Sequence, residues 1–592
     1  MQAKTRLNIS TALIALFLIA APVQALAAVS QISFIHMNDL HANLTPHNDL
    51  VRLLATDGTP YSKIENRGGI ARIATLVKQL RRETPDAILM NIGDTYHGGV
   101  EALYSRGNAI VAPVDALDID IAVPGNWDFA YGPITTRLRY SSGSSPLASL
   151  VNTLLFGTVV KKPSYPVIAG NVRKTLSILL EDEALLPATY MHTVGQVKIG
   201  FIGITSDIVE RMSPMLAWGF TFLEGEEAYK SLIDRHALQL RKEGANLVVV
   251  LSELGLHRDH QLANVVEPGV DIFFSAHTHE LTPTPLQSMS GAIVVEAGND
   301  AYLGKMDVTV VDGIATDIDW EILAVDAGLK EDPEMLLLVN AARAPFLGTD
   351  VHFKYPIPGV DLPLTEAIDT VTGRIPVDLH RRNVLENPFN NLLADAMRDY
   401  YDTDIALTPG FRFDSVISAG SDITLEQLYR YLPVPPVLAK GTITGKNLKA
   451  VFETELMRVF STDAFKHSGG WLMGVSGLEL TLDLTQEEGK RVLAMARISD
   501  MSPILPDDML TVVSCVRPFD GDDIMCSNPG FKSVEKVSGP HGENWTPLQL
   551  LRHSLENTSP GQRSRRHIHD TAEMPSWPNA PYIQPLHSQG LP

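Results

Sequence analysis

The feature that most constrains the fold is a regular alternation in the first half of the chain. Apolar runs over 32–36, 87–92 and 246–251 have the length of buried strands, and segments 69–82 and 228–243 have helical periodicity. This alternation predicts a layered α/β domain, with strands inside and helices outside. Polar residues follow each strand closely, and ligands of α/β folds gather at such strand ends.

The chain is too long for a single domain. Its 592 residues exceed the size at which one hydrophobic core stops growing, so we expect at least two domains. A helical stretch near 324–345 and a proline-rich segment over 355–363 indicate a boundary between them. We expect a signal peptide over 1–27, a first α/β domain over 28–323, a linker over 324–363, a smaller α/β domain over 364–554 and a flexible tail over 555–592.

The N-terminus has the pattern of an export signal. Lys4 and Arg6 precede an apolar run over 11–22, and Ala25-Leu26-Ala27 has the small-x-small pattern of a cleavage site. The run is short for a membrane span, and no later stretch is long and apolar enough to be one. We therefore expect a periplasmic or secreted protein without a stable membrane anchor, and an uncleaved anchor is the alternative.

The charge of the chain excludes one class of partner. A formal net charge of -21 repels a phosphate backbone, so we expect no nucleic-acid binding. The same charge repels small anions at long range. A site for an anionic substrate must therefore create its own positive field, from metal ions or arginines.

The chain has two cysteines, Cys515 and Cys526. They are too few to form a metal site of their own. Disulfides persist outside the cytoplasm, and these two residues are close in sequence. The sequence leaves open whether they form a disulfide or stay unpaired.

Side chains that bind metals follow several of the apolar runs. They are Asp39 with His41, Asp94, Asn126, and His277 with His279. Residues two apart in an extended segment point to the same side, so each spaced pair can face one ion. A lone Asp-x-His is more often a turn than a ligand, but four groups in order at successive strand ends indicate a shared metal centre. Asp, Asn and His suit Mn²⁺, Zn²⁺ or Fe²⁺, and Asp94 can bridge a pair of ions.

These groups resemble the ordered blocks of calcineurin-type metallophosphoesterases. The blocks are Asn38-Asp39-Leu40-His41, Gly93-Asp94, Gly125-Asn126 and Ala276-His277-Thr278-His279. Arg67-Gly68-Gly69-Ile70-Ala71-Arg72 and, in the second half, Asn387-Pro388-Phe389-Asn390-Asn391 and Ser468-Gly469-Gly470 resemble the 5'-nucleotidase branch. The resemblance implies a four-layer α/β sandwich that binds two divalent ions, with manganese favoured. A smaller α/β domain would bind the substrate, and the active site would lie in the cleft between the two.

Two positions at the metal centre depart from the family pattern. Trp127, followed by Asp128, stands where the family has a His that stabilises the leaving group, and an indole cannot transfer a proton. The catalytic position is thus assigned to Asp128 and Trp127, with His97 and His257 as substitutes for the missing His. Glu253 stands where the family has a His ligand, and Glu can bind the same ions. A metal-depleted binding protein is therefore an alternative to an enzyme.

The resemblance also implies which residues of the second domain contact the substrate. They are Arg412, Phe411, Asn387, Arg381 and Phe519. Arg412, with Arg381 or Arg382, would clamp the anion through paired donors, and Phe519 would stack on a base. A surface helix start is the alternative for the Arg381-Arg382 pair. Pro409-Gly410-Phe411-Arg412 departs from the Gly-Gly-x-Arg of nucleotidases, and Val434 replaces the second stacking aromatic.

Together these features predict an exported two-metal hydrolase. The leading interpretation is a phosphomonoesterase acting on 5'-nucleotides, with a metal-bound hydroxide attacking phosphorus. Trp127 and Pro-Gly-Phe-Arg also resemble the thiosulfohydrolase of bacterial sulfur oxidation, a dimanganese enzyme of the same fold. The alternative is therefore a sulfur-ester hydrolase acting on a carrier protein. The expected partner is a small anionic substrate, a nucleotide in the first case and a sulfur-carrier protein in the second.

Overall fold

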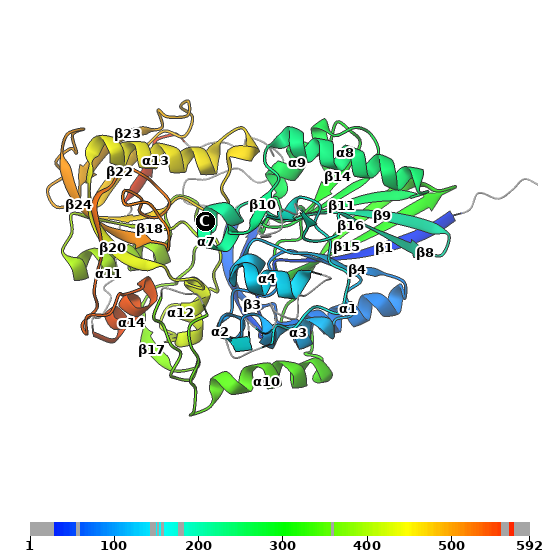
Figure 1. Ribbon diagram of the computed structural model, residues 1–592, viewed down its shortest axis with the longest axis horizontal. Helices are drawn as coiled ribbons and strands as arrows, with labels where there is room; N and C mark the ends of the chain where they lie inside the picture. The colour runs from blue at the N-terminus through cyan, green and yellow to red at the C-terminus, as the bar shows by residue number, and fades with distance from the viewer. Residues whose placement is uncertain are drawn as a thin grey trace, which may run out of the picture.

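The computed structural model describes residues 29–54, 60–141, 150, 153–154, 159–175, 183–356, 360–557 and 567–572. The predicted signal peptide lies outside these residues. Among the helices described, none is both long and apolar enough to cross a membrane. Figure 1 shows two bodies side by side, the first coloured from blue to green and the second from yellow to red.

The N-terminal domain is built on two sheets packed face to face. The first sheet has the order β16-β15-β1-β4-β5 and the second the order β13-β14-β12-β11-β9-β8. The first comprises β16 (Ile314–Ala324), β15 (Tyr302–Val311), β1 (Val29–Asn38), β4 (Ile88–Ile92) and β5 (Ile121–Val123), and the second β13 (Leu286–Gln287), β14 (Ile293–Val295), β12 (Ile272–Ser275), β11 (Leu247–Ser252), β9 (Val197–Ile204) and β8 (Thr189–Val194). Phe34 of the first sheet packs against Phe201 and Phe274 of the second, so the sheets share one core.

Helices cover the outer faces of both sheets and complete four layers. In Figure 1, α8 and α9 lie on one side of the strands, and α1, α3 and α10 (Pro333–Leu347) lie on the other. The helices of this domain are α1 (Ile70–Glu83), α2 (Val100–Ser105), α3 (Asn108–Asp115), a 3₁₀ turn (Trp127–Phe129), α4 (Gly132–Tyr140), α6 (Val209–Met212), α7 (Pro214–Ala217), α8 (Glu226–Lys242) and α9 (Leu256–Val265). The short strands are the hairpin β2 (His47–Leu54) with β3 (Pro60–Arg67), and β6 (Val172–Lys174), β7 (Glu183–Ala184) and β10 (Phe220–Phe222). The predicted four-layer α/β sandwich is thus confirmed.

The central strands are parallel and buried on both faces. Every residue of β4 and β11 is buried, which requires continuous apolar runs instead of alternation. The helices expected over 69–82 and 228–243 are α1 and α8. Their apolar stripes face the sheets, which is the arrangement that stabilises amphipathic helices in globular proteins.

The C-terminal domain is a second, smaller α/β unit. Its main sheet has the order β21-β18-β24-β20-β25. The strands are β17 (Val371–Arg374), β18 (Ile405–Thr408), β19 (Asp422–Thr424), β20 (Val437–Thr444), β21 (Gly474–Ser476), β22 (Leu478–Leu482), β23 (Val492–Arg497), β24 (Met509–Val516), β25 (Lys532–Lys536) and β26 (Ile568–Asp570). The helices are α11 (Pro388–Tyr401), α12 (Leu425–Tyr431), α13 (Gly445–Phe460), a 3₁₀ turn (Ala464–Lys466) and α14 (Pro547–Asn557).

A linker and a flexible tail were expected on either side of the C-terminal domain. The predicted linker contains α10 (Pro333–Leu347), in agreement with the helical stretch expected near 324–345, and its Met335 and Val339 are buried in the core of the N-terminal domain. The expectation of a flexible tail is wrong for residues 567–572, because β26 pairs in parallel with β22. The carboxylate of Glu386 accepts the backbone N–H groups of His567 and Ile568 at 2.9 and 3.1 Å, which holds this strand in place.

Candidate metal centre and interdomain cleft

The central strands of both sheets end near one another, at one edge of the sandwich. Asn38 pairs with Ile92, and Ile92 with Val123, so β1, β4 and β5 end level in the first sheet. In the second sheet Ser252 pairs with Ser275, so β11 and β12 also end level. The residues that follow these ends are the predicted metal ligands, and parallel pairing brings them together.

Six of the seven predicted ligands form two groups. Asp39, His41 and His279 make one group, and Asp94, Glu253 and His277 make the other; within each, the ligand atoms lie within 4.8 Å of one another. The Nε2 atoms of His41 and His279 are 3.1 Å apart, and His277 Nδ1 is 3.6 Å from Glu253 Oε1. His41 Nε2 is also 3.8 Å from Asp94 Oδ2, so the two groups adjoin. The seventh predicted ligand, Asn126, lines the cleft beside Asp94.

The backbone around these ligands is held in an unusual conformation. Asp39, His41, Asp94, His277 and His279 have φ angles of 48°, 46°, 34°, 78° and 56°. Residues other than glycine rarely adopt positive φ, and such positions cluster at functional sites. Gly93 has φ 75°, and a Cβ at this position would overlap the carboxylate of Glu253. A glycine is therefore required there for Glu253 to reach the centre.

Hydrogen bonds hold the carboxylates in defined orientations. Asp39 Oδ2 accepts from Asn38 Nδ2 and from the backbone N–H of His277, both at 2.8 Å. Asp94 Oδ1 accepts from the backbone N–H of Trp127 at 2.7 Å. Each carboxylate therefore keeps its other oxygen for the centre, which is how supporting hydrogen bonds orient metal ligands.

The electrostatics of the centre fit bound cations. Burial, together with the charge of Asp39, raises the pKa of Asp94 and of Glu253 well above their ordinary values. Burial also lowers the pKa of His41 to about 3. Within the described residues, Asp39 Oδ1, Asn126 Oδ1 and both oxygens of Glu253 are buried without a hydrogen-bond partner. Buried oxygens of this kind are costly unless something pairs with them, so the donor set fits two divalent ions.

Trp127 and Asp128 occupy different environments. Asp128 is buried, and its carboxylate accepts the backbone N–H groups of Thr95, Tyr96 and Gly125 at 3.1, 2.7 and 3.1 Å. The carboxylate of Asp128 thus shapes the loop, and the catalytic role assigned to this residue stays a prediction. The Trp127 ring lines the cleft and stacks on His97, with ring centroids 5.2 Å apart.

The metal ligands face a cleft between the two domains. The cleft has a volume of about 470 Å³. His41, Asp94, Asn126, His277 and His279 line its floor, and Phe411, Arg412, Trp471 and Phe519 line the side formed by the C-terminal domain. Phe413 packs on the ring of His41 with centroids 4.3 Å apart, so the C-terminal domain touches the metal centre directly.

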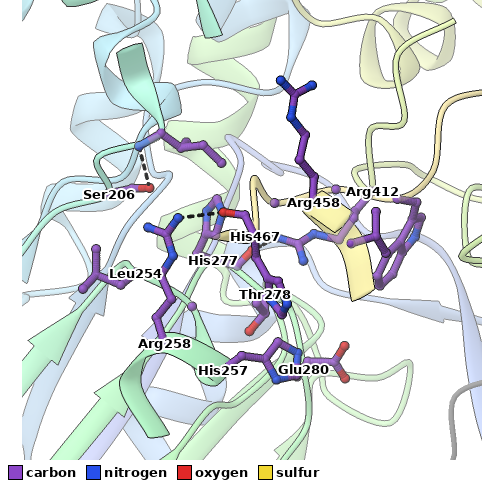
Figure 2. Close-up of a pocket in the computed structure, with 16 residues that line it drawn as sticks. Ser206, Leu254, His257, Arg258, His277, Thr278, Glu280, Arg412, Arg458 and His467 are labelled. Atoms are coloured by element: carbon purple, nitrogen blue, oxygen red, sulfur yellow. Dashed lines mark hydrogen bonds between the residues drawn. The ribbon is translucent and has the colours of Figure 1, made fainter. Parts of the chain in front are cut away.

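A smaller recess, shown in Figure 2, opens beside the cleft. Arg412 lines both, and its guanidinium donates to the carbonyl of His277 at 2.7 Å. The recess has a volume of about 30 Å³, which is room for one or two water molecules. His257 and His467 line it together with Arg258, which donates to the carbonyl of His467 at 2.7 Å.

Two of the residues predicted to bind substrate lie outside the cleft. Asn387 caps α11 and accepts the backbone N–H of Asn390 at 2.9 Å. Arg381 is buried and donates to the carbonyls of Tyr431 and Phe413 at 2.5 and 3.3 Å. Arg381 and the Oδ1 atom of Asn387 thus help to hold the C-terminal domain together, whereas Asn387 Nδ2 is buried without a hydrogen-bond partner among the described residues. Substrate contact by these two residues stays a prediction. Arg382 forms ion pairs with Asp49 and Asp414, so it is not on a surface helix start either.

Several residues of the cleft were missed by the sequence-based reasoning, among them Met212, Trp471 and Arg517. Met212 and Arg517 line it from the N-terminal and C-terminal domains, and the Trp471 ring lies 5.5 Å from the Arg412 guanidinium. Arg517 stands two residues before Phe519, but nothing in its sequence context points to Met212. The structure also answers the question that the cysteines left open, because Cys515 and Cys526 form a disulfide.

Comparison with known proteins agrees with this architecture. Residues 32–281 match the family of calcineurin-like phosphoesterases, and residues 368–524 match the C-terminal domain of 5'-nucleotidases. The chain is 24% identical over 501 residues to a snake venom 5'-nucleotidase of Naja atra, covering 78% of this chain and 84% of that protein. It is 22% identical over 528 residues to the 5'-nucleotidase of Homo sapiens, covering 82% of each chain.

Two solved structures from Thermus thermophilus share the whole fold. A sulfate thiohydrolase, SoxB, superposes with a TM-score of 0.71 at 20% identity, covering 91% of this chain and 96% of that one. A 5'-nucleotidase precursor superposes with a TM-score of 0.70 at 22% identity, covering 91% and 99%. With two matched domains in the same order, this chain belongs to the family of metal-dependent hydrolases that join a calcineurin-like phosphoesterase domain to a 5'-nucleotidase C-terminal domain.

Proposed function

We propose that this protein is an exported two-metal phosphomonoesterase that hydrolyses 5'-nucleotides. The observation that carries the proposal is the pair of ligand groups, Asp39-His41-His279 and Asp94-Glu253-His277, at the floor of a cleft that Arg412 lines from the other domain. The curated relatives named above are 5'-nucleotidases, and the matched regions span both domains.

The seven ligands, including Asn126, would hold two divalent ions, and we favour manganese. When bound, such ions lower the pKa of a shared water and neutralise the oxygens of the transferred group. Arg412 adds a positive charge that binds the anionic group of the substrate. Asp39 and Asp94, fixed by their hydrogen bonds, keep the ligand atoms in place, so little reorganisation is needed during the reaction.

The rest of the cleft would bind the leaving group. A volume of about 470 Å³ falls within the range of sites for ligands of nucleotide size. Phe519 is 78% exposed at the rim, where an aromatic ring can stack on a base. Trp127 and Phe411 form an aromatic wall nearer the metals, with ring centroids 6.0 Å apart.

The direct test is phosphate release from 5'-AMP by the purified, manganese-loaded protein. We expect release with the wild type and none with Asp94→Ala, which removes one ligand of the group Asp94-Glu253-His277. Metal analysis of both proteins shows whether the loss follows from the ions. A wild type that binds fewer than about one ion per chain after loading would point instead to a metal-depleted binding protein.

A second candidate is a sulfur-ester hydrolase that acts on a carrier protein. The observation in its favour is Trp127, which replaces a proton-transferring His, in a chain that superposes on a sulfate thiohydrolase. A wild type that binds two ions but releases no phosphate would favour this candidate. Sulfate release from a peptide carrying a cysteine S-thiosulfonate, measured by ion chromatography, would then test it directly.

Export is the remaining part of the proposal. The basic start, apolar run and Ala25-Leu26-Ala27 pattern favour cleavage before Ala28. N-terminal sequencing of protein recovered from the periplasm or medium tests it. A chain that begins at Met1 in the cytoplasm would contradict it.

A further inference from the structure

We propose that Met212 and Arg517 position the metal ligand Asn126, so that the C-terminal domain helps to build the metal centre. Neither residue belongs to the expected ligand set, and Arg517 comes from the domain opposite. The inference rests on the proposed two-metal function. It is carried by a series of contacts that runs from Arg517 through Met212 to Asn126.

The first contact fixes the orientation of the Asn126 amide. Its Nδ2 donates to the sulfur of Met212 at 3.2 Å. A thioether accepts a hydrogen bond but cannot donate one, so only the nitrogen end of the amide can face it. Oδ1 then faces the other way, and it is buried without a hydrogen-bond partner among the described residues. An amide oxygen held in this way is ready to bind a cation.

The orientation matters because Asn126 adjoins the ligand Asp94. The backbone N–H of Trp127, the next residue, donates to Asp94 Oδ1 at 2.7 Å. The amide and the carboxylate are therefore held by one short turn of backbone. A half-turn of the Asn126 amide would exchange Oδ1 and Nδ2. It would then present to the cation an N–H group, which repels it, in place of an oxygen ligand.

The second contact holds Met212 itself. Met212 ends the four-residue helix α6, and a helix of this length has little stability of its own. The guanidinium of Arg517 donates through Nη1 to the carbonyls of Arg211 and Met212, at 2.5 and 2.7 Å. Asp520 fixes the guanidinium in turn, because its carboxylate accepts from Nη2 at 3.0 Å and from Nε at 3.3 Å. This paired arrangement needs the planar fork of arginine.

The loop that carries Arg517 also faces the substrate. It follows β24, is closed by the disulfide between Cys515 and Cys526, and presents Phe519 to the cleft. The same loop therefore lines the rim of the cleft through Phe519 and holds Met212, which contacts Asn126, through Arg517. A chain in which the two domains separate would lose the support of Met212 even though every metal ligand belongs to the N-terminal domain.

The experiment is a calorimetric titration of the metal-free, full-length protein with Mn²⁺. Loss of a group that orients a metal ligand weakens metal binding by about 10- to 100-fold. We expect Met212→Leu, which keeps the volume but removes the acceptor, to weaken one of the two Mn²⁺ sites by this amount. Met212→Gln restores an acceptor and should recover most of the affinity. Met215→Leu, which removes a thioether from neighbouring α7, is the matched control and should bind like the wild type.

Arg517 is tested by the same titration. Arg517→Ala and Arg517→Lys should both weaken the same site, because lysine lacks the fork that Asp520 fixes. Since Arg517 acts through Met212, the combined variant should bind no more weakly than Met212→Leu alone, which is a non-additive result. Additive losses would show that the two residues act separately and would contradict the proposed series.

Two further results would contradict the proposed role of Met212. Unchanged Mn²⁺ affinity in Met212→Leu would overturn it. Equal loss at both sites, together with a lower unfolding temperature in chelator, would also overturn it, since that pattern indicates general destabilisation. Mn²⁺ binding does not depend on turnover, so a protein that shows the Met212 effect but releases no phosphate would refute the nucleotidase proposal and leave this inference intact.

Discussion

At Trp127 the cleft presents an indole ring at the position where the family resemblance leads us to expect a proton-transferring histidine. The ring is fixed between His97 and Phe411, and its backbone N–H supports Asp94. His97 is stacked behind it and has its pKa lowered to about 3, chiefly by burial. His97 is thus neutral at physiological pH and, screened by the indole, is a poor substitute for the missing group.

A single substitution tests how the replacement of histidine by Trp127 affects turnover. Trp127→His should raise kcat for 5'-AMP by about 10²-fold, the low end of what a positioned general acid contributes. The kcat of this variant should also fall as pH rises above the pKa of the new imidazolium, because the proton donor is then lost. Trp127→Phe, which is aromatic but cannot titrate, is the control in the same kinetic assay. Equal rates for both variants would show that the leaving group needs no donor at this position.

At the scale of single elements, the α9 helix is anchored to the strands that carry metal ligands. Asp259 accepts hydrogen bonds from Ser252 at the end of β11 and from Ser275 at the end of β12, at 2.6 and 2.5 Å. The next residues along these strands include the ligands Glu253 and His277. The anchor therefore helps to keep β11 and β12 level, and its carboxyl group is fully buried.

This anchor predicts a pH dependence of stability. Burial raises the pKa of Asp259 from 3.8 to about 7. Between these values the unfolded chain has lost the proton that the folded chain keeps, so stability falls as pH rises from about 4 to about 7. Asp259→Asn removes the titration and should gain stability over the wild type across this window, by at most about 4 kcal/mol. Urea unfolding of the wild type and of Asp259→Asn, both in the presence of chelator, at pH 4.5 and pH 8 measures the difference in their free energies of unfolding. The same difference at both pH values would contradict the prediction.

The C-terminal strand β26 gives a second prediction at this scale. Ile568 is fully buried in the core of the C-terminal domain. Ile568→Ala should lower the free energy of unfolding by about 2–5 kcal/mol, the usual cost of this truncation in a core. Ile314→Ala is the control, because Ile314 is 68% exposed on β16. If both variants unfold at the wild-type urea concentration, β26 contributes nothing to stability.

At the scale of the whole molecule, the cleft depends on how the two domains dock. Arg258 of α9 donates to the carbonyls of Ala464 and His467 in the C-terminal domain, at 3.2 and 2.7 Å, and pairs with Asp207 at 2.7 Å. A hydrogen bond from a charged group contributes about 1.5–3 kcal/mol. Arg258 therefore stabilises the arrangement in which Arg412 and Phe519 face the metals.

Weakening this contact should affect substrate binding more than metal binding. In Arg258→Ala we expect KM for the substrate to rise several-fold, because fewer chains hold the docked, binding-competent arrangement. At saturating Mn²⁺ the number of bound ions should stay at the wild-type value, since no metal ligand is removed and undocking costs only the support of Asn126. Steady-state kinetics and metal analysis of the same preparation measure both. A loss of metal without a change in KM would show that Arg258 serves the N-terminal domain alone.

The sequence by itself was enough to predict the layered fold and five of the six clustered metal ligands, while Glu253 was assigned through the family resemblance. Both depend on short-range patterns: an apolar run predicts a buried strand, and a glycine or a two-residue spacing places a ligand at its end. Asp39 and His41 belong to one metal group, and Asp94 reaches the second group after Gly93. His277 and His279, which were expected to face one ion, belong to different groups, because both have positive φ and the segment that carries them is not extended. The resemblance to a known family supplied the order of the two domains.

The tertiary structure alone decided which polar residues serve the cleft and which serve the fold. Arg381 and Asn387 are polar residues that turned out to satisfy buried backbone groups, while Met212, an apolar residue, supports a ligand. The pairing of β26 with β22 and the contact of Arg517 with Met212 join segments that are distant along the chain. Such contacts arise from packing between elements and between domains, and no local pattern records which distant group a side chain will meet.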